Sequence, residues 1–218
     1  MTDNITRIQM KYVNCYLVKT GENFVLIDTG IAGERKMLEQ ELSKAGCLPG
    51  NLKLVIITHG DTDHSGNGAW LRDTYGAKLV LHPAETLATE TGSMTACRGK
   101  IPFLARIFLS ILKLPKKDRF KADILADEGY DFSAFGFKAK VYHTPGHSRG
   151  SITILTEEGA LFCGDLLTNR STPAMTDLID DLQAANNSVK RLKALKSTIV
   201  YPGHGNAFTM DTLINKAN

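Results

Sequence analysis

Hydrophobic and polar positions follow two kinds of pattern along the first part of the chain. Alternating or continuously apolar stretches with many β-branched residues predict strands at 12–19, 23–28, 52–58 and 78–81. Apolar residues at helical spacing predict helices at 33–46 and 68–75. Residues 59–67 are rich in glycine, aspartate and serine, so we expect a loop there.

The same two patterns return after residue 121. They predict strands at 137–142, 151–156, 160–163 and 198–201. Glu157-Glu158-Gly159 between two of these strands predicts a hairpin, and a long apolar stripe predicts a helix at 176–196. Residues 202–205 are expected to form a last loop. Strands alternating with helices favour a layered α/β fold, and 218 residues fit a single domain spanning 1–218.

Residues 84–121 interrupt this alternation. The segment IPFLARIFLSILKL within it is apolar and suited to a helix that ends before Pro115. Residues 98–121 hold eight Lys or Arg and one acid, whereas the rest of the chain holds 26 − 8 = 18 basic and 23 − 1 = 22 acidic residues. We expect the insert 84–121 to form a helical cap over a substrate pocket, with a weak membrane-surface patch or an amphipathic helix with solvated lysines as alternatives. A homodimer contact through 84–121 is a further alternative.

Composition excludes several classes of protein. A net charge of +3 is too small to indicate nucleic-acid binding by itself. No apolar run is long enough for a transmembrane helix, and the first residues carry no apolar signal region, so a cytoplasmic location is expected. The four cysteines show no CxxC spacing, so we expect reduced thiols.

Histidines and aspartates gather in loops that follow predicted strands. The sequence His-Gly-Asp-Thr-Asp-His at 59–64 places two imidazoles and two carboxylates within six residues. Buried carboxylates need a partner, and a metal ion that accepts N and O ligands supplies one. His143-Thr-Pro-Gly-His147, Gly164-Asp165 and Pro202-Gly203-His204-Gly205 follow later strands in the same way. We interpret the isolated His82, and also His143, as structural.

These motifs, in this order, resemble those of the metallo-β-lactamase superfamily. The family's HxHxDH motif and its later His, Asp and His correspond here to 59–64, His147, Asp165 and His204, and the wording HTPGHS and LIDTG is also the family's. HTPGHS and PGHG look most like glyoxalase II and related hydrolases. The resemblance implies a four-layer αββα sandwich with a dinuclear metal site at one edge of its sheets.

The resemblance also implies a role for each site residue. The first metal ion would take His59, Asp61 and His147, and the second would take Asp63, His64 and His204. Asp165 would bridge the two ions, with a hydroxide between them, and Asp28 would orient the metal loop. Asp63 and Asp165 are the residues that we expect to take part in catalysis.

Asp61 departs from the family pattern, which has histidine at this position. Two divalent ions carry a charge of +4, which Asp61, Asp63, Asp165 and one hydroxide would neutralise. A carboxylate at residue 61 favours Fe or Mn more than histidine does, although zinc remains the first choice.

The expected activity is metal-dependent hydrolysis of a small ester, thioester or lactone, with an anionic or acyl small molecule as substrate. A phosphodiesterase or nuclease of the same fold, and a non-catalytic binding or regulatory protein with a modified metal site, are the alternatives. No nucleic-acid partner is expected.

Overall fold

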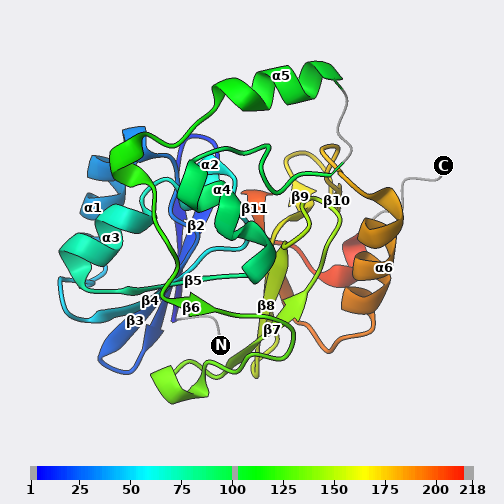
Figure 1. Cartoon of the computed structure of the whole chain (residues 1–218). Helices are drawn as coiled ribbons and strands as arrows, with labels where there is room; N and C mark the ends of the chain where they lie inside the picture. Colours follow the sequence, from blue (N-terminus) through cyan, green and yellow to red (C-terminus); the bar gives the residue numbers. More distant parts are fainter. Residues whose placement is uncertain (1–3, 100–102, 214–218) are drawn as a thin grey trace.

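The computed structural model describes residues 4–99 and 103–213, and within them two β-sheets pack face to face with helices outside both (Figure 1). The first sheet has the strand order β1-β2-β3-β4-β5-β6. Its strands are β1 (Ile5–Gln9), β2 (Asn14–Thr20), β3 (Asn23–Ile27), β4 (Leu52–Ile56), β5 (Lys78–Leu81) and β6 (Ile124–Leu125). Neighbours from β1 to β3 are antiparallel, and those from β3 to β6 are parallel.

The second sheet has the order β10-β9-β8-β7, and β11 joins it by parallel pairing with β9. Its strands are β7 (Ala139–His143), β8 (Ile152–Thr156), β9 (Ala160–Asn169), β10 (Ala174–Met175) and β11 (Ile199–Gly205). The antiparallel pairing of β8 with β9 confirms the predicted hairpin.

Six α-helices and five short 3-10 helices are assigned within the described residues. The α-helices are α1 (Arg35–Lys44), α2 (Thr62–Ser65), α3 (Gly68–Tyr75), α4 (Thr86–Thr91), α5 (Phe103–Ile111) and α6 (Leu182–Lys193). The 3-10 helices are η1 (Ala32–Glu34), η2 (Pro83–Glu85), η3 (Lys116–Asp118), η4 (Ser133–Phe135) and η5 (Met210–Thr212).

Alternate residues of the central strands face different hydrophobic cores. In β4, Leu54 and Ile56 join the core between the two sheets, whereas Val55 joins the core beneath α1 and α3. Side chains on a strand point alternately to its two faces, so a strand covered on both sides reads as a continuous apolar run. The continuous run at 52–58 in the sequence has this cause.

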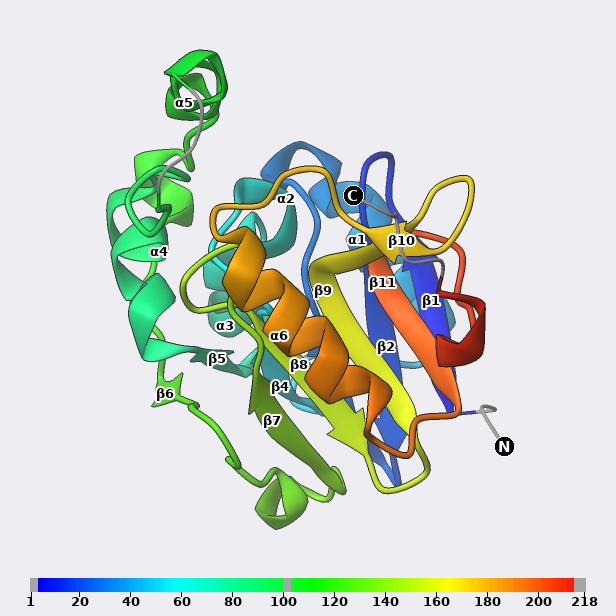
Figure 2. The same cartoon turned by 90° about the vertical axis from the view of Figure 1, so that its right-hand side faces the viewer.

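Helix α6 covers the outer face of the second sheet (Figure 2). Its Ala185 and Leu192 pack with Leu161 of β9 and Val200 of β11 in a third hydrophobic core. With α1 and α3 on the other side, the layers are helix, sheet, sheet and helix, which confirms the expected αββα architecture.

Several predicted boundaries are wrong, among them the end of the strand expected at 160–163, which continues in β9 to Asn169. The expected loop 59–67 contains the short helix α2, and residues 202–205 belong to β11. The helix expected at 176–196 begins only at Leu182, where the Asp181 side chain accepts a hydrogen bond of 2.9 Å from the backbone N–H of Ala184. Capping by Asp181 fixes this start, and the residues before it run as an irregular connection.

The insert 84–121 contains α4, α5 and η3, and residues 100–102 of it lie outside the described residues. Helix α5 stands beyond α2 and α4, at the edge of the sandwich where α2 lies (Figure 1). Its Phe103, Leu104 and Ile111 are 76%, 78% and 74% exposed. Within the described residues, no helix has the length and apolar character needed to cross a membrane.

Candidate metal centre

The residues singled out in the sequence meet at one edge of the sandwich. His59, Asp61, Asp63 and His64 follow β4 and extend into α2, and His147 lies in the turn between β7 and β8. Asp165 and His204 belong to β9 and β11, which pair side by side. The sheets therefore bring together, at one place, residues that are far apart in the sequence.

Each of the four histidines is held through its Nδ1 atom, so that its Nε2 atom faces the others. The Nδ1 partners are Thr58 Oγ1 for His59 (3.1 Å), Asp28 Oδ2 for His64 (2.8 Å), the Leu178 carbonyl for His147 (2.7 Å) and the Tyr12 carbonyl for His204. Where the partner is a carbonyl or a carboxylate, Nδ1 carries the proton and Nε2 keeps its lone pair. Such outer contacts are typical of histidines that bind a metal ion.

His59, Asp61 and His147 form a first group of converging atoms. His147 Nε2 lies 3.1 Å from His59 Nε2 and 3.2 Å from Asp61 Oδ2, and His59 Nε2 lies 3.5 Å from the same oxygen. Ligand atoms about 2.1 Å from one tetrahedral ion lie about 3.4 Å apart. The spacing of the first group therefore suits a metal ion.

Asp63, His64 and His204 form a second group, and Asp165 lies between the two groups. Asp165 approaches His64 Nε2 to 3.2 Å and His204 Nε2 to 3.0 Å, while Asp63 Oδ2 lies 3.8 Å and 3.6 Å from these two nitrogens. His64 Nε2 and Asp165 Oδ1 are buried without a hydrogen-bond partner. A metal ion would satisfy both atoms, so the donor set fits one here as well.

The titration of the buried groups reflects this crowding of opposite charges. Burial opposes a charge on His64, but Asp165, Asp28 and Asp63 together raise its pKa well above the usual value. Burial also opposes a charge on Asp61, but the neighbouring Arg98 and histidines hold the pKa of its carboxyl well below the ordinary range. Asp61 thus stays ionised at this depth because positively charged groups lie beside it.

Glycine is needed where β11 passes the second group. A Cβ atom on Gly203 would lie 2.4 Å from Asp165 Oδ1 and 2.7 Å from His64 Cε1. Any side chain at this position would displace both residues, so the PGHG motif serves close approach as well as turning.

Two residues of the insert also reach the site, and the sequence analysis did not single them out. Glu85, 1% exposed, accepts hydrogen bonds of 2.8 Å from the backbone N–H groups of Gly60 and Gly150, and so connects the loops that carry His59 and His147. Arg98 is 5% exposed and contacts Asp61. In the sequence, Glu85 follows an LHP turn and belongs to no motif, so its burial at the site cannot be predicted. Arg98 is one of the eight basic residues at 98–121, and nothing in the sequence distinguishes it from the others.

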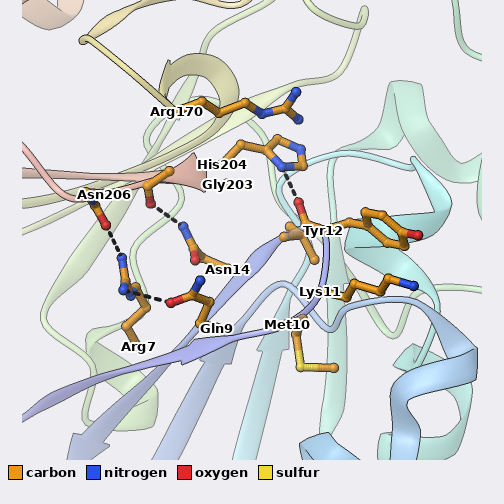
Figure 3. Close-up of a pocket in the computed structure, with 12 residues that line it drawn as sticks. Arg7, Gln9, Met10, Lys11, Tyr12, Asn14, Arg170, Gly203, His204 and Asn206 are labelled. Carbon is orange, nitrogen blue, oxygen red and sulfur yellow. Dashed lines mark hydrogen bonds between the residues drawn. The ribbon is translucent and has the colours of Figure 1, made fainter.

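His204 also borders a pocket on the side of β1 and β2 (Figure 3). Arg7, Lys11 and Arg170 line this pocket with it. The Asn14 side chain donates hydrogen bonds to the carbonyls of Pro202 (3.1 Å) and Gly205 (2.7 Å), which fixes the strand on either side of His204.

The other two histidines, His82 and His143, lie outside the two groups and stack on each other. His82 Nε2 lies 3.0 Å from Asp127 Oδ1, and His143 Nε2 lies 2.9 Å from the Arg149 carbonyl. The two imidazole rings stack with their centroids 4.3 Å apart and an interplanar angle of 12°, and with Asp127 they form a further possible ligand group away from the other two. Cys15, Cys47, Cys97 and Cys163 are all buried and free, as expected of reduced thiols.

Comparison with known proteins gives the same family. The model of the metallo-beta-lactamase superfamily matches residues 10–204. The chain is 26% identical over 214 residues to the beta-lactamase-like protein 2 homolog of Caenorhabditis elegans, covering 94% of this chain and 62% of that protein. It is 26% identical over 206 residues to the atrochrysone carboxyl ACP thioesterase of Aspergillus fumigatus, covering 93% of this chain and 53% of the thioesterase. The solved di-iron-bound form of TTHA1623 is 30% identical, with a TM-score of 0.71 and 95% of each chain covered.

The chain therefore belongs to the metallo-β-lactamase superfamily of hydrolases. Its αββα sandwich is that of the family, and its described residues include groups suited to hold metal ions. The chain spans less than two thirds of the worm and fungal proteins that it matches.

Proposed function

We propose that this protein is a metal-dependent hydrolase of a small acyl substrate: an ester, a thioester or a lactone. The observation that carries this proposal is the convergence of four Nε2 atoms and three carboxylates at one edge of the sandwich. Such a donor set suits two divalent ions, with zinc as the first choice and iron or manganese as alternatives. The di-iron form of TTHA1623 supports a dinuclear site.

When bound, divalent ions in this position would supply a hydroxide at neutral pH and would polarise the carbonyl that it attacks. His59, Asp61 and His147 would hold the first ion, Asp63, His64 and His204 the second, and Asp165 both. Asp28 fixes His64 through Nδ1 at 2.8 Å. Asp63 is the most exposed of the three carboxylates, with a side chain 24% exposed, so it is the one best able to accept a proton from a substrate.

Two observations support an anionic or acyl substrate. The fungal relative is named as an ACP thioesterase. In addition, Lys11 and Arg170 line the pocket beside His204, and positive side chains next to a reaction centre attract anions (Figure 3).

We further propose that the insert 84–121 forms a cap over this site. Two of its residues, Glu85 and Arg98, already contact the site. The exposed apolar side chains of α5 would then cover an acyl chain, or alternatively meet a second copy of this protein.

The test is to purify the full chain from unsupplemented medium, to quantify its metals, and to assay that sample on ester, thioester, lactone, phosphodiester and β-lactam substrates. We expect bound transition metal and hydrolysis of at least one of the three acyl classes, abolished by a chelator. Turnover of the phosphodiester alone would assign a phosphodiesterase. Metal binding without turnover of any class would favour a binding or regulatory protein.

A further inference from the structure

We propose that the Arg98 guanidinium binds to the first group and competes with a metal ion for the same ligand atoms. The second group then binds its ion first, and the first group binds an ion only when Arg98 moves away. This inference rests on the proposed function, because it concerns how the same centre takes up its metal ions.

Arg98 reaches into the first group from the insert. Its Nη2 atom lies 2.9 Å from His147 Nε2 and forms an ion pair with Asp61 Oδ2. These are two of the three atoms that would bind the first ion, and they lie 3.2 Å apart. The guanidinium therefore stands in the space that the ion would need.

The chemistry of His147 makes the two occupants mutually exclusive. His147 Nδ1 lies 2.7 Å from the Leu178 carbonyl, so Nδ1 carries the proton and Nε2 has a single lone pair. That lone pair accepts the N–H of Arg98 in the structure. A metal ion needs the same lone pair, so one cation must leave before the other binds.

Asp61 explains why an arginine is held there. Asp61 is 5% exposed, and a carboxylate so deeply buried needs a cation beside it. Histidine at this position would make no ion pair with a guanidinium. Asp61, which departs from the family pattern, therefore also accounts for the position of Arg98.

Further contacts hold the guanidinium in place. Nη1 lies 3.3 Å from Asp180 Oδ1 and also donates to the His147 carbonyl, and Asp180 Oδ2 accepts the backbone N–H of Gly99 at 2.7 Å. The Arg98 Nε atom is buried without a partner. Within the described residues, the ion pairs of the second group join its own histidines and carboxylates, and none of them involves an arginine or a lysine.

The experiment is a zinc titration of the metal-stripped full chain, with bound zinc counted by elemental analysis and each affinity measured against a competing chelator. We expect one zinc ion to bind tightly and a second to bind at least about tenfold more weakly, because a hydrogen-bonded charge pair must first be broken. In Arg98→Gln, the second affinity should rise by about tenfold or more while the first stays unchanged. Arg106→Gln, which removes an exposed arginine of the same insert, should match the parent protein.

Arg98→Met keeps the buried volume without the charge and serves as a second variant if the glutamine variant does not fold. Two equally tight ions in the parent protein, unchanged by either Arg98 variant, would overturn the competition. They would leave the proposed hydrolase function standing. Failure of the parent protein and of the variants to bind any zinc would instead contradict the proposed function itself.

Discussion

At the scale of single residues, the proposed metal centre depends on side chains that orient its proposed ligands. Asp28 is the clearest case, because it accepts hydrogen bonds from Thr58 N (2.8 Å) and Thr58 Oγ1, and from His64 Nδ1 (2.8 Å). It does so from a left-handed backbone with φ of 59°, which only few residue types other than glycine tolerate. Loss of such an outer carboxylate weakens metal binding without removing a ligand.

Asp28→Asn tests this role, since asparagine also tolerates the left-handed conformation. We expect zinc affinity to fall by about 10- to 100-fold, because the neutral amide no longer orients and polarises His64 as a carboxylate does. Competition with a chelator measures the loss, and circular dichroism checks the fold. Asp73→Asn, an exposed change on α3, is the control. Equal affinities in the two variants would contradict the orienting role.

Asp61→His restores the residue type of the family motif. It raises the charge of the site by one and supplies a softer nitrogen ligand, so the affinity for zinc should rise relative to the affinities for iron and manganese. It also removes the carboxylate that pairs with Arg98. Competition among the three metals, followed by elemental analysis, measures the preference. An unchanged order of preference would show that residue 61 does not contact the first ion.

At the scale of elements, the short helices η2 and α4 tie the insert to both metal loops. Glu85 ends η2, and its two carboxylate oxygens accept the N–H groups of Gly60 and Gly150 at 2.8 Å each. Burial raises the pKa of Glu85, and these two hydrogen bonds act in the opposite direction. One side chain thus satisfies two buried donors from distant parts of the chain.

Glu85→Ala should lower the free energy of unfolding by about 2–4 kcal/mol, because it leaves two buried N–H groups unpaired. Urea unfolding followed by circular dichroism gives the difference. Glu90→Ala, an exposed change on α4, should alter it by less than about 0.5 kcal/mol. Similar values for the two variants would mean that water replaces the Glu85 carboxylate at no cost.

Helix α5 is the element that the cap proposal depends on. A double variant, Leu104→Ser with Ile111→Ser, removes two exposed apolar side chains and should leave folding unchanged. For a long-chain acyl thioester, we expect KM to rise about tenfold, whereas KM for an acetyl ester should stay the same. Leu48→Ser with Leu125→Ser, exposed residues elsewhere, is the control. A change in quaternary state without a change in KM would assign α5 to a contact between copies.

At the scale of the whole molecule, the proposed ligands come from both sheets. His59 to His64 follow the first sheet, whereas Asp165 and His204 belong to the second. Metal ions bound by both would therefore link the two sheets across the core between them. Binding to the folded state alone also stabilises it by mass action.

Removal of metal should accordingly lower the melting temperature. Zinc at about 1,000 times its Kd stabilises the folded state by about 4 kcal/mol, which corresponds to about 8–16 °C for a domain of this size. Thermal unfolding with and without a chelator, followed by zinc addition, measures the shift. Calcium, which prefers oxygen ligands, should not restore it. A melting temperature independent of zinc would argue against metal binding by the folded state.

The layered fold can be predicted from local patterns in the sequence, and the proposed ligand set from the motifs that carry the family resemblance. Strand periodicity identified β2, β3, β4, β5, β7 and β8, and the family motifs singled out every residue of the two groups. Periodicity does not reveal β1, β6 and β10, because their short or partly polar runs have no strong period. Residues 202–205 were expected in a loop, but they pair in parallel with β9 and belong to strand β11.

The residues that reach the proposed site from distant parts of the chain can be identified only once the chain is folded. Glu85 and Arg98 carry no motif, and their roles arise from backbone N–H groups and lone pairs that folding brings to them. In the sequence, Asp61 is an exchange of one metal ligand for another that changes the charge of the site by one. In the structure, Asp61 forms an ion pair with the buried guanidinium of Arg98. The role of a charged side chain buried this deeply depends on the groups that lie next to it in space.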